Sequence, residues 1–151
     1  MDDHTVEDIR GDLTLSTDRA RIDVDDVLAM LRESHWGRSM TRSMLERAIA
    51  NSVCVGVYEA SGRQIAFSRA VTDLATYAYL TDVMVADHVR GGGLGSWMIE
   101  AILAHPDLQG LRRVALWTRN ARAFYERLGF STKLPASTYM EIHPGPDARP
   151  V

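Results

Sequence analysis

The spacing of apolar and polar residues along the chain predicts a succession of strands and helices. Apolar residues recur at a period of about 3.6 in segments 23–34 and 41–52 and again between Leu94 and Pro106, as in amphipathic helices. Runs rich in β-branched and aromatic residues predict strands at 12–18, 53–59, 63–72, 76–86, 111–118 and 138–143. Segment 120–130 predicts a further helix, which Gly129 closes as a C-cap.

The order of these elements is βααβββαβαβ, which predicts an α+β fold in which helices cover a mixed sheet. Segments 53–59 and 63–72 are joined by the turn residues 60–62 and predict a hairpin. At 151 residues, the chain is expected to form one domain, 1–151. We expect loose termini at 1–11 and at 144–151, the latter being rich in proline and glycine.

Composition and charge narrow the function classes. Hydrophobic residues make up 46% of the chain and the net charge is −3, which argues against binding to nucleic acid or to anionic membranes but leaves a small anionic ligand open. The single cysteine excludes an internal disulfide. No segment resembles a signal peptide, and no apolar run approaches the ~20 residues that span a bilayer. A cytoplasmic location is therefore expected.

The segment "VRGGGLGSWMIEAIL" (89–103) places four glycines between a strand and a helix. A helix N-terminus presents unpaired N–H groups and a partial positive charge, and glycine lets a phosphate approach the backbone closely. The loop therefore indicates a phosphate or pyrophosphate site, although a plain tight turn explains a glycine cluster about as well. Neither a P-loop nor a dinucleotide fingerprint fits, because Ser96 and Met98 stand where those motifs need other residues.

Two motifs together resemble the GNAT superfamily of N-acetyltransferases. Arg90-x-x-Gly93-x-Gly95 is similar to the coenzyme A loop of that family, and "NARAFYERLGF" (120–130) is similar to its second signature. The resemblance covers roughly residues 53 to 142. It implies a single-domain, mostly antiparallel sheet with helices on both faces, acetyl-CoA as co-substrate, and direct attack of an amine on the thioester in a ternary complex.

The resemblance also implies roles for individual residues. Met84 and Val85 would pair with the pantetheine arm, and a backbone N–H there would polarise the thioester carbonyl. Asn120 would contact the pantetheine region, although an N-cap for the following helix is an equal alternative. Tyr125 would protonate the leaving thiolate, the alternative being a core tyrosine. The pyrophosphate would be held by the loop residues Arg90, Gly91, Gly92, Gly93, Leu94, Gly95 and Ser96.

The acceptor side carries weaker signals. Asp82 lies in an apolar strand and is the best candidate for a general base, although a carboxylate satisfied by an arginine or by backbone N–H groups is at least as good an explanation. Tyr79 and Glu141 are weaker candidates. Trp36, Tyr77 and Tyr79 are expected to form the wall of an apolar or aromatic substrate pocket, and Trp36 fits a lid packed on the core equally well.

No metal site is expected, because His35 and His88 lack partners at ligand spacing. Cys54 fits a buried core position better than a nucleophile. The sequence thus predicts an N-acetyltransferase that uses acetyl-CoA. Its rivals are a non-catalytic acyl-CoA-binding module and a nucleotide-binding domain. The amine is not identified, and because family members often pair, a homodimer is one expectation.

Overall fold

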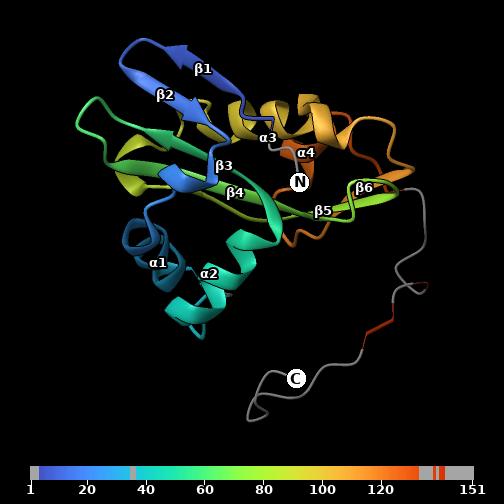
Figure 1. Cartoon of the computed structure of the whole chain (residues 1–151). Helices are drawn as coiled ribbons and strands as arrows, with labels where there is room; N and C mark the ends of the chain where they lie inside the picture. Colours follow the sequence, from blue (N-terminus) through green and yellow to red (C-terminus); the bar gives the residue numbers. More distant parts are fainter. Residues whose placement is uncertain (1–3, 35–36, 133–137, 139, 142–151) are drawn as a thin grey trace. The chain divides into compact units, whose positions relative to one another are not determined.

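Six strands form one sheet in the residues that the computed structural model describes, which are 4–34, 37–132, 138, 140 and 141 (Figure 1). Contacts between residues divide the chain into two units, 1–120 and 121–151, and every strand lies in the first unit. The expectation of a single domain over 1–151 therefore stays a prediction. The strands are β1 (Glu7–Arg10), β2 (Leu13–Ser16), β3 (Ser52–Tyr58), β4 (Gln64–Thr72), β5 (Tyr77–Val85) and β6 (Arg113–Leu116).

The strands lie in the sheet in chain order, β1 to β6. All neighbours are antiparallel except β5 and β6, which are parallel. A parallel pair needs a crossover connection, and helix α3 (Leu94–Ala104) supplies it. The predicted mixed, mostly antiparallel sheet is therefore confirmed, and so is the predicted 53–72 hairpin.

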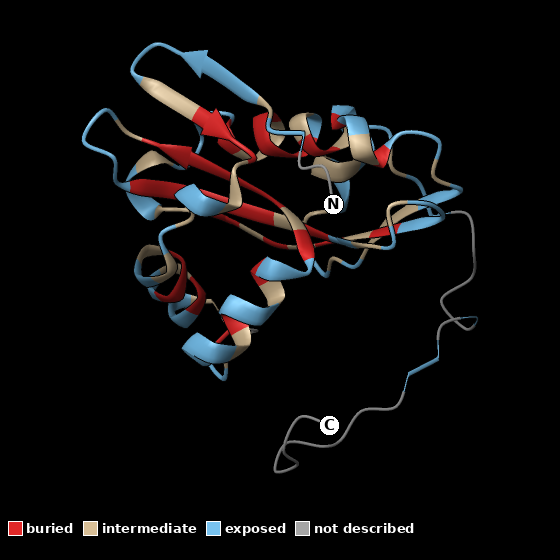
Figure 2. Ribbon diagram, viewed as in Figure 1, coloured by how far each residue is buried: buried red, intermediate tan, exposed pale blue. Residues whose placement is uncertain are grey.

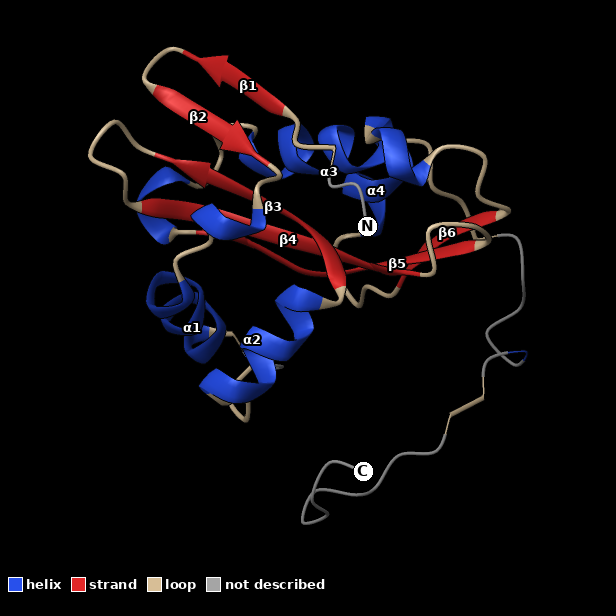
Figure 3. Ribbon diagram, in the orientation of Figure 1, coloured by secondary structure: helices blue, strands red, loops and turns tan. Residues whose placement is uncertain are grey.

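Helices cover both faces of the sheet, as predicted (Figure 3). On one face lie α1 (Val24–Glu33) and α2 (Arg42–Ala50), and α3 lies on the other. Asp23 and Thr41 cap the first two helices by accepting hydrogen bonds from Asp26 N–H and Met44 N–H. Three short 3-10 helices stand in the connections of the described chain: η1 (Arg19–Arg21), η2 (Asp87–Val89) and η3 (Pro106–Leu108). No described helix is long and apolar enough to cross a bilayer.

The buried residues form a layer on each face of the central strands (Figure 2). Under α1 and α2, a cluster joins side chains of both helices to Cys54, Phe67 and Met84 of the sheet. Cys54 is fully buried there, as predicted. The predicted apolar stripe of α3 is buried too, through Leu94, Trp97, Met98, Ile99 and Ile102.

The prediction of a loose segment 1–11 is wrong, because β1 occupies Glu7–Arg10 within it. Its side chains are exposed, so the strand is held by pairing with β2 rather than by burial. Asp8 also accepts a hydrogen bond of 2.8 Å from the indole N–H of Trp97, and the Arg10 guanidinium lies 4.5 Å from the centre of that ring. Contacts made by polar side chains leave no apolar pattern for sequence reasoning to detect.

The predicted strand 138–143 is not seen where the structure can test it. Residues 138, 140 and 141 do not belong to a strand, and residues 139, 142 and 143 lie outside the described chain. Segment 144–151 lies outside it as well.

Tyr58 provides a stability prediction. Its side chain is 2% exposed, its hydroxyl has no hydrogen-bond partner among the described residues, and burial raises its pKa above the ordinary value of about 10. Tyr58→Phe removes a buried hydroxyl that lacks a partner, so stability at pH 7 should be unchanged or higher by up to about 1 kcal/mol.

The same substitution should change the alkaline limb of stability. Below about pH 10 the phenol is neutral in both the folded and the unfolded chain, but above it only the unfolded chain ionises readily, so the wild type loses stability as pH rises. Urea unfolding from pH 7 to 11 should show a smaller alkaline loss in Tyr58→Phe. Identical alkaline slopes in the two proteins would contradict this assignment.

Candidate functional site

The candidate site is the junction at which β5 leads through η2 and a glycine loop into α3. Gly91 and Gly93 have φ angles of 81° and 79°, in the left-handed region that favours glycine. Gly93 is the N-cap of α3. The loop therefore needs glycine at two positions for backbone geometry, which supports the tight-turn interpretation without excluding an anion site.

Among the described residues, no side chain caps the N-terminus of α3. Its first hydrogen bond runs from Trp97 N–H to the Gly93 carbonyl at 3.0 Å, so the N–H groups of Leu94, Gly95 and Ser96 have no acceptor inside the helix. The N-cap has no side chain to accept from them, and no acidic residue lies in the first turn. The partial positive charge of the helix end therefore has no compensating carboxylate within its first turn, as an anion site requires.

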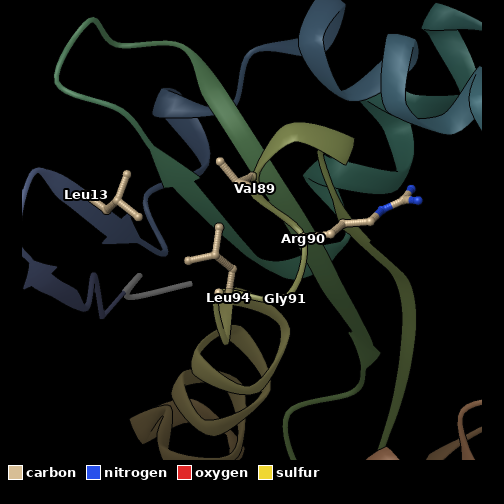
Figure 4. Close-up of a pocket in the computed structure, with 6 residues that line it drawn as sticks. Leu13, Val89, Arg90, Gly91 and Leu94 are labelled. Atoms are coloured by element: carbon tan, nitrogen blue, oxygen red, sulfur yellow. The ribbon is translucent and has the colours of Figure 1, made fainter.

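An open hollow of about 430 Å³ lies against this loop (Figure 4). Its lining combines the loop residues Arg90, Gly91 and Gly92 with the apolar residues Leu13, Val89 and Leu94. Leu13 comes from β2, a strand with no motif, and sequence reasoning missed it because only the sheet brings β2 beside the loop. The hollow is thus apolar on one side and offers loop backbone on the other.

Arg90 and His88 hold the loop to its surroundings. The Arg90 guanidinium pairs with Asp87 at 2.8 Å, and its Nε donates to the Val85 carbonyl at 3.2 Å. The Arg90 side chain is 66% exposed and points away from Leu13 in Figure 4, so a ligand at the surface can reach its charge. The His88 ring lies 3.2 Å from a carboxylate oxygen of Glu59, just after β3.

The end of β5 exposes one of the two backbone positions expected to contact the ligand. Ala86 N–H donates to the Ile65 carbonyl of the chain segment paired with β5. Because backbone groups of successive strand residues point to opposite sides, those of Met84 face β4 and those of Val85 face away from it. β6 pairs only with Tyr77–Leu80, so it does not cover this edge. The geometry therefore favours the backbone of Val85, rather than that of Met84, as the position that contacts the ligand. The side chain of Met84 is buried.

The surroundings of Asp82 match the alternative interpretation, in which an arginine satisfies its carboxylate. Its side chain is 5% exposed, and Oδ2 accepts a hydrogen bond of 2.6 Å from Arg69 Nε. Arg69 also donates to Ser52 Oγ at 3.2 Å. The carboxylate is thus satisfied by an arginine, and its role as a general base stays a prediction.

Two of the three predicted pocket residues lie on β5, on the face that α1 and α2 cover elsewhere. Tyr79 stands directly opposite Val71 of β4, which shares a face with Phe67 and Arg69 by strand alternation. Val71 is 43% exposed and Tyr77 is 41% exposed. We call Val71, Tyr77 and Tyr79 the tyrosine shelf. Trp36, the third predicted residue, lies outside the described residues, as does His35.

Tyr125 lies in the second unit, on helix α4 (Arg122–Arg127). Its ring packs edge-on against Phe124 and Phe130, with centroids 4.9 and 5.9 Å away. Burial raises the pKa of its phenol above the ordinary value of about 10, at which the hydroxyl is already protonated at neutral pH, as an acid requires. The predicted C-cap lies one residue earlier, at Leu128, but Gly129 closes the helix: it has a φ of 97°, and the N–H groups of Phe130 and Gly129 donate to the carbonyls of Tyr125 and Glu126.

The alternative role of Asn120 as an N-cap is wrong. Helix α4 starts at Arg122, and its N-cap is Ala121, which makes no side-chain cap hydrogen bond. Asn120 is exposed and precedes the cap. Its expected contact with the pantetheine region stays a prediction. Glu141, the other weak base candidate, is exposed in the second unit. No group of three metal-ligating side chains occurs among the residues that the structure describes.

Comparison with known proteins gives a consistent result. The family model of the acetyltransferase (GNAT) domain matches residues 50–132. A protein of Gibberella zeae assigned as an acetyltransferase, FG08082, is 34% identical over 131 residues, with 72% of this chain and 73% of that protein covered. Chloroplastic serotonin N-acetyltransferase 2 of Oryza sativa is 33% identical over 92 residues, covering 58% of this chain and 46% of the rice protein.

A solved structure agrees over most of the chain. A Xanthomonas campestris protein assigned to the GNAT family of acetyltransferases has 39% sequence identity and a TM-score of 0.81. The match covers 87% of this chain and 92% of the bacterial one. The match therefore extends beyond residues 50–132, to which the family model is limited.

Proposed function

The chain belongs to the GNAT family of acetyltransferases, and on that premise we propose that it transfers an acetyl group from acetyl-CoA to a primary amine in a ternary complex. The observation that carries the proposal is the open N-terminus of α3 at the end of β5. It offers backbone N–H groups to a pyrophosphate, beside the part of β5 after Leu80, whose edge β6 leaves open and which can pair with the amides of pantetheine.

The reaction needs no covalent intermediate on the enzyme. The amine nitrogen attacks the thioester carbonyl and the C–S bond breaks. The leaving thiolate takes up a proton and becomes the thiol of CoA. We assign the polarisation of the carbonyl to the Val85 N–H, which faces the open edge, and protonation of the thiolate to Tyr125. The attacking nitrogen releases one proton to a base or to water. Positioning and polarisation would supply most of the acceleration.

We place the acceptor on the tyrosine shelf. Val71 and Tyr77 are exposed there and Tyr79 is partly buried, and such apolar and aromatic side chains on a sheet face favour an amine with an apolar or aromatic body. The name of the rice relative specifies serotonin, an arylalkylamine, as its substrate. Serotonin and tyramine are therefore the first acceptors to test, beside polyamines, amino acids and lysine peptides.

An amine panel with detection of the free thiol tests this proposal. The purified protein should release CoA from acetyl-CoA only when an amine is present, and mass spectrometry should find the acetylated amine. Tight binding of acetyl-CoA without turnover on any amine would instead support the non-catalytic acyl-CoA-binding module.

Thermal shift should show that the pyrophosphate is the main anchor. CoA and acetyl-CoA should both raise the melting temperature, because a ligand that binds only the native state stabilises it. Acetyl-pantetheine lacks the nucleotide and should raise it far less. Equal shifts from all three compounds would contradict the assignment of the α3 N-terminus. ATP is the control for the rival nucleotide-binding domain, which predicts an ATP shift that competes with CoA.

A further inference from the structure

A β-bulge interrupts β5 at Asp82. Arg69 of β4 stands opposite Thr81, and Phe67 stands opposite Met84, so Asp82 and Val83 together face the single residue Ser68. Asp82 has a φ of 53°, a left-handed conformation that aspartate and asparagine tolerate better than most other side chains. A bulge bends its strand and locally disrupts the ladder of hydrogen bonds.

The bulge lies between the two parts of β5 that have different tasks. Upstream, Tyr77–Leu80 pairs with β6. Downstream, β5 keeps its pairing with β4 through Met84 and Val85 but has no pairing with β6. The open edge that would take pantetheine therefore begins at the bulge.

A buried ion pair clamps the bulge from the face of α1 and α2. Arg69 is 13% exposed, Asp82 is 5% exposed, and their Nε–Oδ2 distance is 2.6 Å. Arg69 is itself fixed by the 3.2 Å bond to Ser52 on β3. The ion pair thus ties the left-handed residue to the regular part of the sheet, across β4 to β3.

We infer that Arg69 and Asp82 are positioning residues that hold the bulge of β5 and thereby set the Val85 edge for the thioester. The inference rests on the proposed function for the identity of the ligand. This inference replaces the prediction that Asp82 is the general base. The carboxylate of Asp82 is bound to Arg69, so Asp82 would affect the reaction only through the position of the β5 backbone.

The two roles of Asp82 give opposite results in Asp82→Asn. Asparagine tolerates the left-handed conformation and keeps a side-chain oxygen for Arg69, but it does not accept a proton as a carboxylate does. Positioning predicts an unchanged pH profile, with the loss falling on the KM for acetyl-CoA more than on kcat, because Arg69 keeps a hydrogen bond but loses its charge partner. A general base predicts a kcat about 10²- to 10⁴-fold lower and loss of one limb of that profile. The second result would overturn the inference.

Two further variants remove the clamp. Asp82→Gly accepts the left-handed φ without the ion pair, and Arg69→Met removes the cation while keeping a long side chain. Both should raise the KM for acetyl-CoA by about tenfold or more, with a smaller change in kcat. In the free protein, both should also speed hydrogen exchange at Met84 and Ala86, whose N–H groups face β4. If both variants exchange these amides at the wild-type rate, the inference is overturned. This test needs no substrate.

A matched core change separates positioning from general stability. Ile49→Val trims a buried side chain of α2 in the cluster on the same face of the sheet. The loss of melting temperature in this variant is the reference, and the variant should leave the KM for acetyl-CoA and hydrogen exchange at Met84 and Ala86 unchanged. Equal effects from Ile49→Val would reduce the ion pair to a general stabiliser. If the wild type neither binds acetyl-CoA nor turns over, the proposed function fails, while exchange still tests the clamp.

Discussion

Tyr125→Phe should lower kcat roughly 10²- to 10⁴-fold while acetyl-CoA affinity stays close to that of the wild type. A phenol with the ordinary pKa of about 10 carries a proton at neutral pH, and burial raises the pKa of Tyr125 further, so the proton that the leaving thiolate needs is in place. The hydroxyl would contribute mainly as charge develops on sulfur, and such an interaction affects turnover rather than binding. Steady-state kinetics with a verified amine at saturating acetyl-CoA measure the first quantity, and calorimetry the second.

The packing of Tyr125 makes phenylalanine a clean substitution. The ring contacts Phe124 and Phe130 edge-on, and phenylalanine keeps both contacts, so stability should change by no more than about 1 kcal/mol. Phe124→Leu is the matched control, because it alters this aromatic packing and leaves the phenol in place. It should lower stability and preserve kcat. A kcat of Tyr125→Phe within about threefold of wild type, with chemistry rate-limiting, would leave Tyr125 a packing residue.

Sequence reasoning predicted the elements whose own residues specify them. Apolar side chains at helical spacing identify α1, α2 and α3, because each helix buries one stripe against the sheet. The glycine at the C-terminal end of α4 was predictable for a similar local reason, since a left-handed φ selects for glycine. The loop before α3 follows the same rule, at Gly91 and Gly93.

Features that depend on distant partners were harder to predict. β1 contains one apolar residue, Ile9, and even this is 70% exposed, so no alternation marks the strand. The bulge in "YLTDVMV" depends on Arg69, thirteen positions earlier, and on the register of β4. From the sequence, an arginine partner for Asp82 is therefore one alternative, and nothing in the local residues selects it over a general base. Leu13 entered the candidate site in the same way, through sheet order alone.

Gly93→Val should weaken acetyl-CoA binding by at least about tenfold, or about 1.4 kcal/mol. Gly93 is the N-cap of α3 and has a φ of 79°, where a β-branched residue is strained. A Cβ built there meets no atom of the protein within 4 Å, so the added side chain projects into open space. We expect this space to be occupied by the pyrophosphate, which the side chain would hold away from the N–H groups of the helix. Calorimetry on the folded variant measures the loss.

Gly110→Val separates backbone strain from loss of the phosphate site. Gly110 has a φ of 76°, and a Cβ there also meets nothing within 4 Å, so the two substitutions introduce nearly the same strain into equally open surroundings. Gly110 follows η3, outside the loop that we assign to the pyrophosphate. Both variants should lose similar stability, and only Gly93→Val should lose affinity for acetyl-CoA. If both variants bind as the wild type does, the N-terminus of α3 is a tight turn and the pyrophosphate lies elsewhere. If both lose affinity equally, the effect comes from general destabilisation, and the loop has no special role in binding.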